Sequence, residues 1–258
     1  MVRHRAATFV STRNLVPEKI GEHSTWVWPL VGPVHADTLL TTWLVMIVSL
    51  AFFAYLGSSY RTNRVNQTQS AFEGTINYLS DLAVGTLGPK GEPFVPIFVG
   101  MFFFIFILNQ IGFFPFKLLG LPFGGSPTAD ISTTIAFAAV VFFGIQFVAI
   151  RKSGIKAYAH LFKPFPILVI INVIEETARP IVLALRLFFN IFVGELLLFV
   201  VASVVASNVK IGPVNLSLVA AVVPFFLQLL NFFIGSLQAF VFTLLTIVYL
   251  SLATADEH

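Results

Sequence analysis

The chain has 258 residues, of which 57% are hydrophobic and only 10% are charged, and its mean hydropathy is +0.91. Water-soluble domains contain roughly 25% charged residues, so this chain has too little polar surface for a soluble globule, and we predict an integral membrane protein. The lack of cysteine excludes disulfides and cysteine nucleophiles, and a net charge of +3 is too small for a nucleic-acid-binding surface.

The first part of the chain, residues 1–37, carries charged side chains and no long apolar run, so it lacks the apolar region of a signal peptide. We expect it to be a polar segment outside the membrane. Residues 38–258 are the expected membrane domain, which starts with a charge-free run at residues 38–60. At about 1.5 Å per residue, this run can cross a hydrocarbon core of about 30 Å as one helix.

Two further membrane spans and one surface helix are predicted in the next part of the chain. In residues 71–87, apolar residues recur every three or four positions between polar ones, which indicates an amphipathic helix on the membrane surface. Glycines and prolines follow it as helix breakers. The charge-free runs at residues 94–116 and 131–150 are long enough to form the second and third spans.

The last two apolar segments, residues 167–207 and 213–254, are unusually long. At about 1.5 Å per residue each would extend roughly 60 Å, twice the thickness of the hydrocarbon core. Length alone is consistent with two spans in each segment or with one long, steeply tilted helix in each. In either case the expected fold is an all-α integral membrane protein.

Basic residues at the ends of the predicted spans indicate the orientation of the chain. Arg61 and Arg64 follow the first span, and a basic loop follows the third, with Arg151, Lys152, Lys156 and Lys163. Because cytoplasmic loops carry an excess of Lys and Arg, both span ends are expected in the cytoplasm. This orientation places the N-terminus outside and, for five spans, the C-terminus in the cytoplasm.

The fourth segment contains ionisable side chains within an apolar run, namely Glu175, Glu176, Arg179, Arg186 and Glu195. Charges inside a membrane cost roughly 2.5 to 3.5 kcal/mol each on insertion scales, so they indicate function by default. At about 100° per residue, Arg186 shares a face with Asn190 and with the three charged residues before it, whereas Glu195 points elsewhere. The alternative for those three is a structural role, because they suit the interfacial start of a helix.

Arg186 and Glu195 have the properties needed to move protons. Arginine stays charged in proteins, whereas a carboxylate can bind and release a proton. A local ion pair between them is not expected, since nine residues separate them by about 13 Å along a helix axis. The last segment adds one polar face, with Gln228, Asn231, Gly235, Gln238, Thr246 and Tyr249. Amides of this kind also serve as packing contacts between membrane helices, which is the alternative interpretation of this face.

Two distinctive motifs lie in the last two segments: RLFFNIFVGE at residues 186–195 and LQAFVFTLLTIVYLS at residues 237–251. They resemble the two most diagnostic stretches of the a subunit of F-type ATP synthases of the bacterial type. Three more occur in the family's order: NQIGFFP at residues 109–115, PTADIST at residues 127–133 and EETARPIVLAL at residues 175–185. Together the motifs are spread over most of the chain after residue 90.

The resemblance implies five transmembrane segments plus a surface helix, with the last two segments forming a long tilted hairpin against a rotating ring of c subunits. It implies b subunits of the peripheral stalk and the rest of the F1Fo complex as further partners. The family's essential arginine corresponds to Arg186, and the glutamate of its outer half-channel to Glu195. The other residues implied near the path are Asn190, Gln238 and, for the inner half-channel, Glu175 and Glu176.

Two positions depart from the family pattern. Many relatives carry histidine or glutamate seven residues before the glutamine, where this chain has Asn231, which cannot titrate. The outer path is therefore expected to depend more on Glu195 and on water. The glycine that usually precedes the asparagine is replaced by Phe189, which calls into question how closely another helix can approach there.

The predicted function is that of the proton-conducting stator subunit of the Fo sector, with Arg186 between two offset half-channels. We expect no cofactor, no metal and no enzymatic activity of the chain itself, because it lacks the nucleotide-binding G-x-x-x-x-G-K-[ST] and metalloprotease H-E-x-x-H motifs. The alternatives are an ion-coupled secondary transporter, for which no convincing internal repeat is found, and a non-conducting membrane assembly subunit. Without a transit peptide, the expected location is a bacterial inner membrane.

Overall fold

The computed structural model describes residues 25–28, 32–59, 67–113, 126–154, 169–206 and 216–254. The chain divides into two compact units, Met1–Ala36 and Asp37–His258. The first unit contains a short antiparallel hairpin of strands β1 (Thr25–Trp28) and β2 (Gly32–His35), in which Thr25 pairs with His35. The hairpin is not among the expected elements, since residues 1–37 are expected only to be a polar segment.

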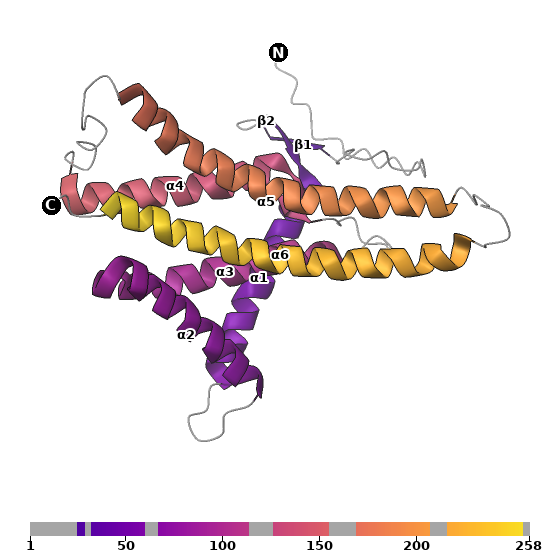
Figure 1. Ribbon diagram of the computed structural model, residues 1–258, viewed down its shortest axis with the longest axis horizontal. Coiled ribbons are helices and arrows are strands. Elements are labelled where there is room, and N and C mark those ends of the chain that lie inside the picture. The colour runs from indigo at the N-terminus through magenta and orange to yellow at the C-terminus, as the bar shows by residue number, and fades with distance from the viewer. Residues whose placement is uncertain are drawn as a thin grey trace, which may run out of the picture. The chain divides into compact units, whose positions relative to one another are not determined.

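The second unit is helical throughout its described part, which confirms the predicted all-α membrane fold (Figure 1). Within the described residues, five stretches are long and apolar enough to cross a membrane. The first is helix α1 (Ala36–Ser59). The second joins helix α2 (Gln67–Leu87), the 3-10 helix η1 (Gly88–Phe94) and helix α3 (Val95–Gln110). The others are helices α4 (Ile131–Ser153), α5 (Val169–Ala206) and α6 (Leu216–Thr254).

Helices α5 and α6 are both continuous, with 38 and 39 residues, although Pro180 and Pro224 lie inside them. Each long segment of the sequence is therefore one helix and not two spans. At about 1.5 Å per residue each helix extends about 57 Å, so it exceeds a hydrocarbon core of about 30 Å and fits a membrane only when steeply tilted. Figure 1 shows the two helices running antiparallel and side by side.

Helix α2 packs one of its faces against α3 and α6. Leu79 and Ala83 on this face are buried, whereas Asp81 is exposed. The hydroxyl group of Ser251 in α6 donates a hydrogen bond of 3.1 Å to the carbonyl oxygen of Thr86. The amphipathic pattern at residues 71–87 thus provides a surface for packing against two transmembrane helices.

The turn after α2 requires glycine at two positions. Gly88 has a φ of +69°, in the left-handed region that side chains disfavour. At Gly91 a Cβ atom would lie 2.7 Å from the carbonyl oxygen of Ala83, so only glycine lets η1 fold back onto the last turns of α2.

Both ends of α4 are stabilised by side chains. At its start, the carboxylate of Asp130 accepts a hydrogen bond of 2.9 Å from the backbone N–H of Ser132, which caps the helix. At its end, Arg151 and Lys152 complement the helix dipole. The ammonium group of Lys152 also donates a hydrogen bond to the carbonyl oxygen of Thr254, which ties the end of α4 to the end of α6.

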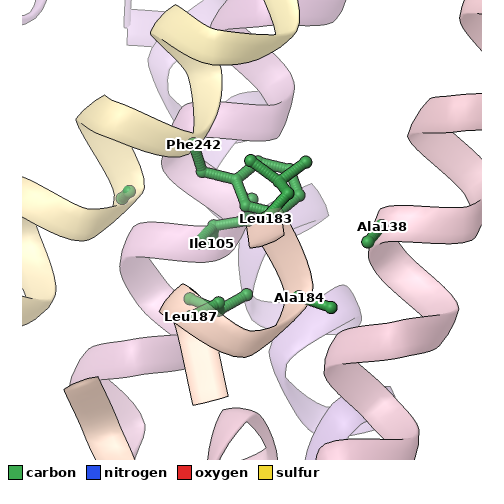
Figure 2. Close-up of a cluster of buried hydrophobic side chains, with 7 residues drawn as sticks. Ile105, Ala138, Leu183, Ala184, Leu187 and Phe242 are labelled. Atoms are coloured by element: carbon green, nitrogen blue, oxygen red, sulfur yellow. The ribbon is translucent and has the colours of Figure 1, made fainter. Parts of the chain in front are cut away.

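The main hydrophobic core lies where α3, α4, α5 and α6 meet. Phe242 and Leu187 are fully buried there, and Leu183 is 1% exposed. Figure 2 shows Leu183 and Leu187 of α5 packed near Ile105 of α3 and Phe242 of α6. The alanines of the cluster provide little bulk, which lets the helix backbones approach closely: Ala138, Ala184 and Ala239. This core determines how α5 is rotated about its own axis. Leu183 and Leu187 face the core, so residue 186, which lies on a different face of the helix, is turned away from it.

We expect Phe242→Ala to destabilise the assembled complex, because it leaves a cavity where four helices meet. Truncation of a buried phenylalanine costs roughly 3–5 kcal/mol in folded proteins. The measurement is the thermal unfolding of the detergent-solubilised complex. Phe143→Ala is the matched control, since this side chain in α4 is 68% exposed. Equal stability of the two variants would contradict the proposed core.

Candidate functional site

Arg186 lies in the middle of α5, on its exposed side. Leu183 and Leu187 are buried, whereas side chains spaced three or four residues apart form an exposed stripe: Val182, Arg186, Phe189 and Val193. Among the described residues, the guanidinium group of Arg186 has neither a hydrogen bond nor an ion pair. A permanent charge in an apolar membrane surface is costly, which favours a functional role for this residue.

One turn after Arg186, the side chain of Asn190 links α5 to α6. Its amide nitrogen donates a hydrogen bond of 2.7 Å to the side-chain oxygen of Gln238. Gln238 is only 3% exposed, and its own amide nitrogen has no hydrogen-bond partner within the described part of the chain. Unpaired buried donors are unusual in proteins and often mark functional sites.

Glu195 lies on the opposite side of α5 from Arg186. Nine residues at about 100° each amount to half a turn beyond two full turns, and they separate the two residues by about 13 Å along the axis. The carboxylate of Glu195 is half-buried and accepts a hydrogen bond of 2.9 Å from the backbone N–H of Ser126. The structure therefore keeps these two charged residues apart instead of pairing them.

A buried hydrogen-bond network holds the segment that contacts Glu195. The hydroxyl of Ser126 donates a hydrogen bond of 3.0 Å to the carbonyl oxygen of Leu108 and lies 2.6 Å from the hydroxyl of Thr128. The hydroxyl of Thr128 donates to the side-chain oxygen of Asn109 at 2.9 Å. The amide nitrogen of Asn109 in turn donates to the carbonyl oxygen of Gly235 at 3.0 Å. These bonds connect α3, the 3-10 helix η4 (Pro127–Ala129) and α6.

The roles of Asn109, Ser126 and Thr128 are not evident from the sequence. Asn109 and Thr128 belong to the motifs NQIGFFP and PTADIST, which indicate the family but not which atoms meet. The sequence feature that could have indicated these roles is the position of the two motifs, one at the end of the apolar run 94–116 and the other at the start of the run 131–150. Amides and hydroxyls at such positions can form hydrogen bonds between helices. The structure shows that these motifs build the support for Glu195.

A small polar pocket lies beside the carboxylate of Glu195. Its volume is about 30 Å³, which exceeds the roughly 10–15 Å³ that a water molecule needs. Its polar lining comes from three helices and one connecting segment, and consists of Asn109, Ser126, Asn190, Glu195, Gln228 and Asn231. The pocket thus brings together residues that the sequence analysis had singled out. Asn190 and Glu195 come from α5, and Gln228 and Asn231 from the predicted polar face of α6. Arg186 and Gln238 are not part of its lining.

Asn231 reaches this pocket because it packs directly over Gly194. A Cβ atom at Gly194 would lie 2.5 Å from the side-chain oxygen of Asn231, so a larger residue cannot be accommodated without movement. Phe189, where the family pattern has glycine, is 52% exposed. The close approach of α5 and α6 therefore occurs at Gly194, and the ring of Phe189 does not prevent it.

The charged residues at the start of α5 form a separate cluster. Arg179 pairs with Glu175 at 3.0 Å and with Glu176 at 3.1 Å. The amide nitrogen of Gln146 in α4 donates a hydrogen bond of 2.8 Å to Glu176, and Arg179 lies over the ring of Tyr249, 5.6 Å from its centroid. The Glu175 side chain remains 66% exposed, against 18% for Glu176. This cluster lies about 15 Å along the helix from Arg186, at about 1.5 Å per residue.

The polar face predicted for α6 divides into parts with different partners. Gln228 and Asn231 line the pocket beside Glu195, and Gln238 bonds to Asn190. The hydroxyl of Thr246, in contrast, donates to the carbonyl oxygen of Phe242 in its own helix. The same hydroxyl also lies 3.9 Å from the sulfur of Met101 in α3, so Thr246 contributes to packing between helices, as the alternative interpretation of this face expects.

A family model described as ATP synthase A chain matches residues 39–251, which is nearly all of the unit from α1 to α6. The chain belongs to the ATP synthase A chain family. Members of this family are the proton-translocating stator subunit of the Fo sector, a multi-pass membrane protein that is not an enzyme by itself. This match confirms the resemblance found in the motifs and decides against the secondary transporter and the non-conducting assembly subunit.

We expect Gly194→Ala to impair proton translocation, because the added methyl group must displace Asn231 from the pocket beside Glu195. Gly85→Ala is the control: a Cβ atom there meets no atom within 4 Å, and Gly85 of α2 lies outside the network around Glu195. ATP-driven proton pumping by membrane vesicles that carry the assembled complex measures the difference. Similar pumping by both variants would show that the approach of Asn231 to Gly194 is unimportant.

Proposed function

We propose that this subunit conducts protons through two offset half-channels that reach the rotating c-ring at different depths, with Arg186 between them. The observation that carries the proposal is the separation of two charged residues. Arg186 has no ion pair or hydrogen bond with the described residues and lies among exposed apolar side chains, whereas Glu195 lies on the opposite side of α5 beside a polar pocket. A proton cannot pass the permanently charged guanidinium directly, so it has to travel with the ring.

The exposed sides of α5 and α6 are the proposed surface for the c-ring. Around Arg186 the exposed residues are apolar, and α6 exposes a similar apolar set: Phe226, Leu230, Phe233 and Leu237. A smooth apolar surface allows sliding, whereas a single positive charge attracts an ionised carboxylate of the ring. As a protonated carboxylate of the ring approaches Arg186, the positive field favours release of its proton.

The outer half-channel is proposed to run through the pocket beside Glu195. The carboxylate can bind and release a proton, and the pocket has room for water to carry the proton onward. Asn231 contributes an amide that can order water but cannot titrate. Asn190 and Gln238, bonded to each other between the pocket and Arg186, are proposed to line the inner end of this path.

The inner half-channel is proposed to begin at Glu175 and Glu176. Glu176 is held by Arg179 and Gln146, whereas the side chain of Glu175 is largely exposed. Glu175 is therefore better placed to exchange protons with water, and Glu176 to keep Arg179 in position.

The proposed orientation follows the basic residues at the end of α4. With Arg151 and Lys152 in the cytoplasm, the C-terminus is cytoplasmic, the N-terminus is outside, and residues 1–37 form a segment outside the membrane domain. Lys156 and Lys163, which belong to the same basic loop, lie outside the described residues, as do Arg61 and Arg64. The proposed partners are the c-ring, the b subunits and the remaining F1Fo subunits in a bacterial inner membrane.

We expect Arg186→Ala to reduce ATP-driven proton pumping by about 10²-fold or more, the usual cost of removing a charge that acts electrostatically in a dry site. The passive proton leak should rise, because the barrier between the half-channels is lost. Both rates are measured in vesicles that carry the whole complex at matched subunit levels.

Arg151→Gln is the control for Arg186→Ala, since it removes another exposed arginine, at the end of α4 and outside the proposed proton path. It should retain most of the pumping activity. Pumping at near the normal rate by the assembled Arg186→Ala complex would refute the proposed barrier.

We expect Glu195→Gln to slow proton pumping by about 10²-fold, in the range usual for loss of a proton-transfer group. Adding Asn231→Asp to this variant should restore part of the rate, because it returns a carboxylate to the same pocket. Glu92→Gln, at an exposed carboxylate of η1, is the control and should pump normally. Near-normal pumping by Glu195→Gln, whose amide oxygen can still accept the hydrogen bond from Ser126, would show that Glu195 acts by holding Ser126 and not as a proton carrier.

A further inference from the structure

A large apolar groove lies between α3 and α4, away from the residues of the proton path. Its volume is about 1460 Å³, which exceeds the roughly 300–1,000 Å³ of typical small-molecule pockets. The walls are mainly aromatic and aliphatic, and include Phe98, Phe104, Phe137, Val140 and Phe147. Residues of α6 form its floor, where Phe242 and Leu250 are buried.

Two glycines widen the groove, one on each wall. Gly100 of α3 and Gly144 of α4 both line it, and a Cβ atom added at either would meet no atom within 4 Å. The apolar side chains around them remain open, with Ile97 63% and Val140 71% exposed. The groove can therefore accept long apolar chains between its walls without any rearrangement of the helices.

One end of the groove is basic. Among the described residues, the charged ones that line it are Lys90 of η1 and Arg151 and Lys152 at the end of α4, and all three are exposed. Lys152 also bonds to the carbonyl oxygen of Thr254, so its ammonium group is held at this rim. The groove thus has one cationic end and an apolar length, which matches the two parts of an anionic lipid.

We propose that this groove binds an anionic phospholipid, with its acyl chains along α3 and α4 and its phosphate at Lys90, Arg151 and Lys152. Basic residues next to hydrocarbon attract anionic headgroups, and basic pockets between transmembrane helices bind such lipids. A transmembrane helix of a partner subunit would also fill an apolar groove, but it would not require three basic residues at one end. The charge of the rim therefore favours the lipid.

The test uses the purified whole complex, depleted of lipid and then equilibrated with phosphatidylglycerol or with zwitterionic phosphatidylcholine. Bound lipid per complex is quantified by mass spectrometry of the extracted lipids. The wild type should retain phosphatidylglycerol in preference to phosphatidylcholine. In Lys90→Gln/Arg151→Gln the binding should be about 30-fold weaker, which corresponds to about 1 kcal/mol for each charge removed. Lys90→Arg/Arg151→Lys keeps both charges and should bind normally.

A second variant tests the apolar part of the groove. Gly144→Leu places a side chain in the open space and should displace at least part of the bound phosphatidylglycerol. Gly57→Leu is the matched control, because Gly57 in α1 also has no neighbour within 4 Å of an added Cβ atom and does not line the groove.

Three results would overturn the proposal. The first is equal retention of phosphatidylglycerol and phosphatidylcholine by the wild type. The second is unchanged binding of phosphatidylglycerol in both the charge-removal variant and Gly144→Leu. The third is loss of a partner subunit from the Gly144→Leu complex with no loss of lipid, which would identify a protein helix as the occupant. If Gly144→Leu does not assemble, the pair of charge variants still decides between a lipid and no lipid.

Discussion

The antiparallel contact between α5 and α6 is the interaction on which the rest of the structure depends. It is made at several points along two helices of 38 and 39 residues: Phe242 fills the core beside Leu183, Asn190 bonds to Gln238, and Asn231 packs over Gly194. Because a rigid helix repeats its geometry, these contacts together determine its rotation. Arg186 is exposed and Glu195 is turned towards Ser126 as a direct result.

The cost of placing charge in a membrane explains the surroundings of each ionisable residue of α5. Glu176 is compensated by Arg179 and Gln146, and Glu195 by the backbone N–H of Ser126. Arg186 has no such compensation among the described residues. An uncompensated charge on an apolar surface is stable only when another molecule supplies the opposite charge, which is consistent with a stator that works against a rotor.

Helices α3 and α4 have different surroundings at their two ends. At one end, Asn109 and Ser126 support the carboxylate of Glu195 through buried hydrogen bonds. At the other, Arg151 and Lys90 form the basic rim of the apolar groove. A lipid held in this groove would stiffen the same helices that position the proposed proton path, so the two proposed sites share one framework without sharing residues.

The sequence by itself determined the helical membrane fold, the family and the separation of Arg186 from Glu195. Hydropathy and helical periodicity act on each segment alone, since insertion costs and the angle of about 100° per residue do not depend on neighbouring helices. The sequence left open whether each of the last two segments forms one long helix or two spans. Only the tertiary structure decided that Ser126 holds Glu195, that Asn231 fits over Gly194 and that Gln146 bonds to Glu176. These contacts join residues distant in the chain, and their pairing depends on how whole helices pack.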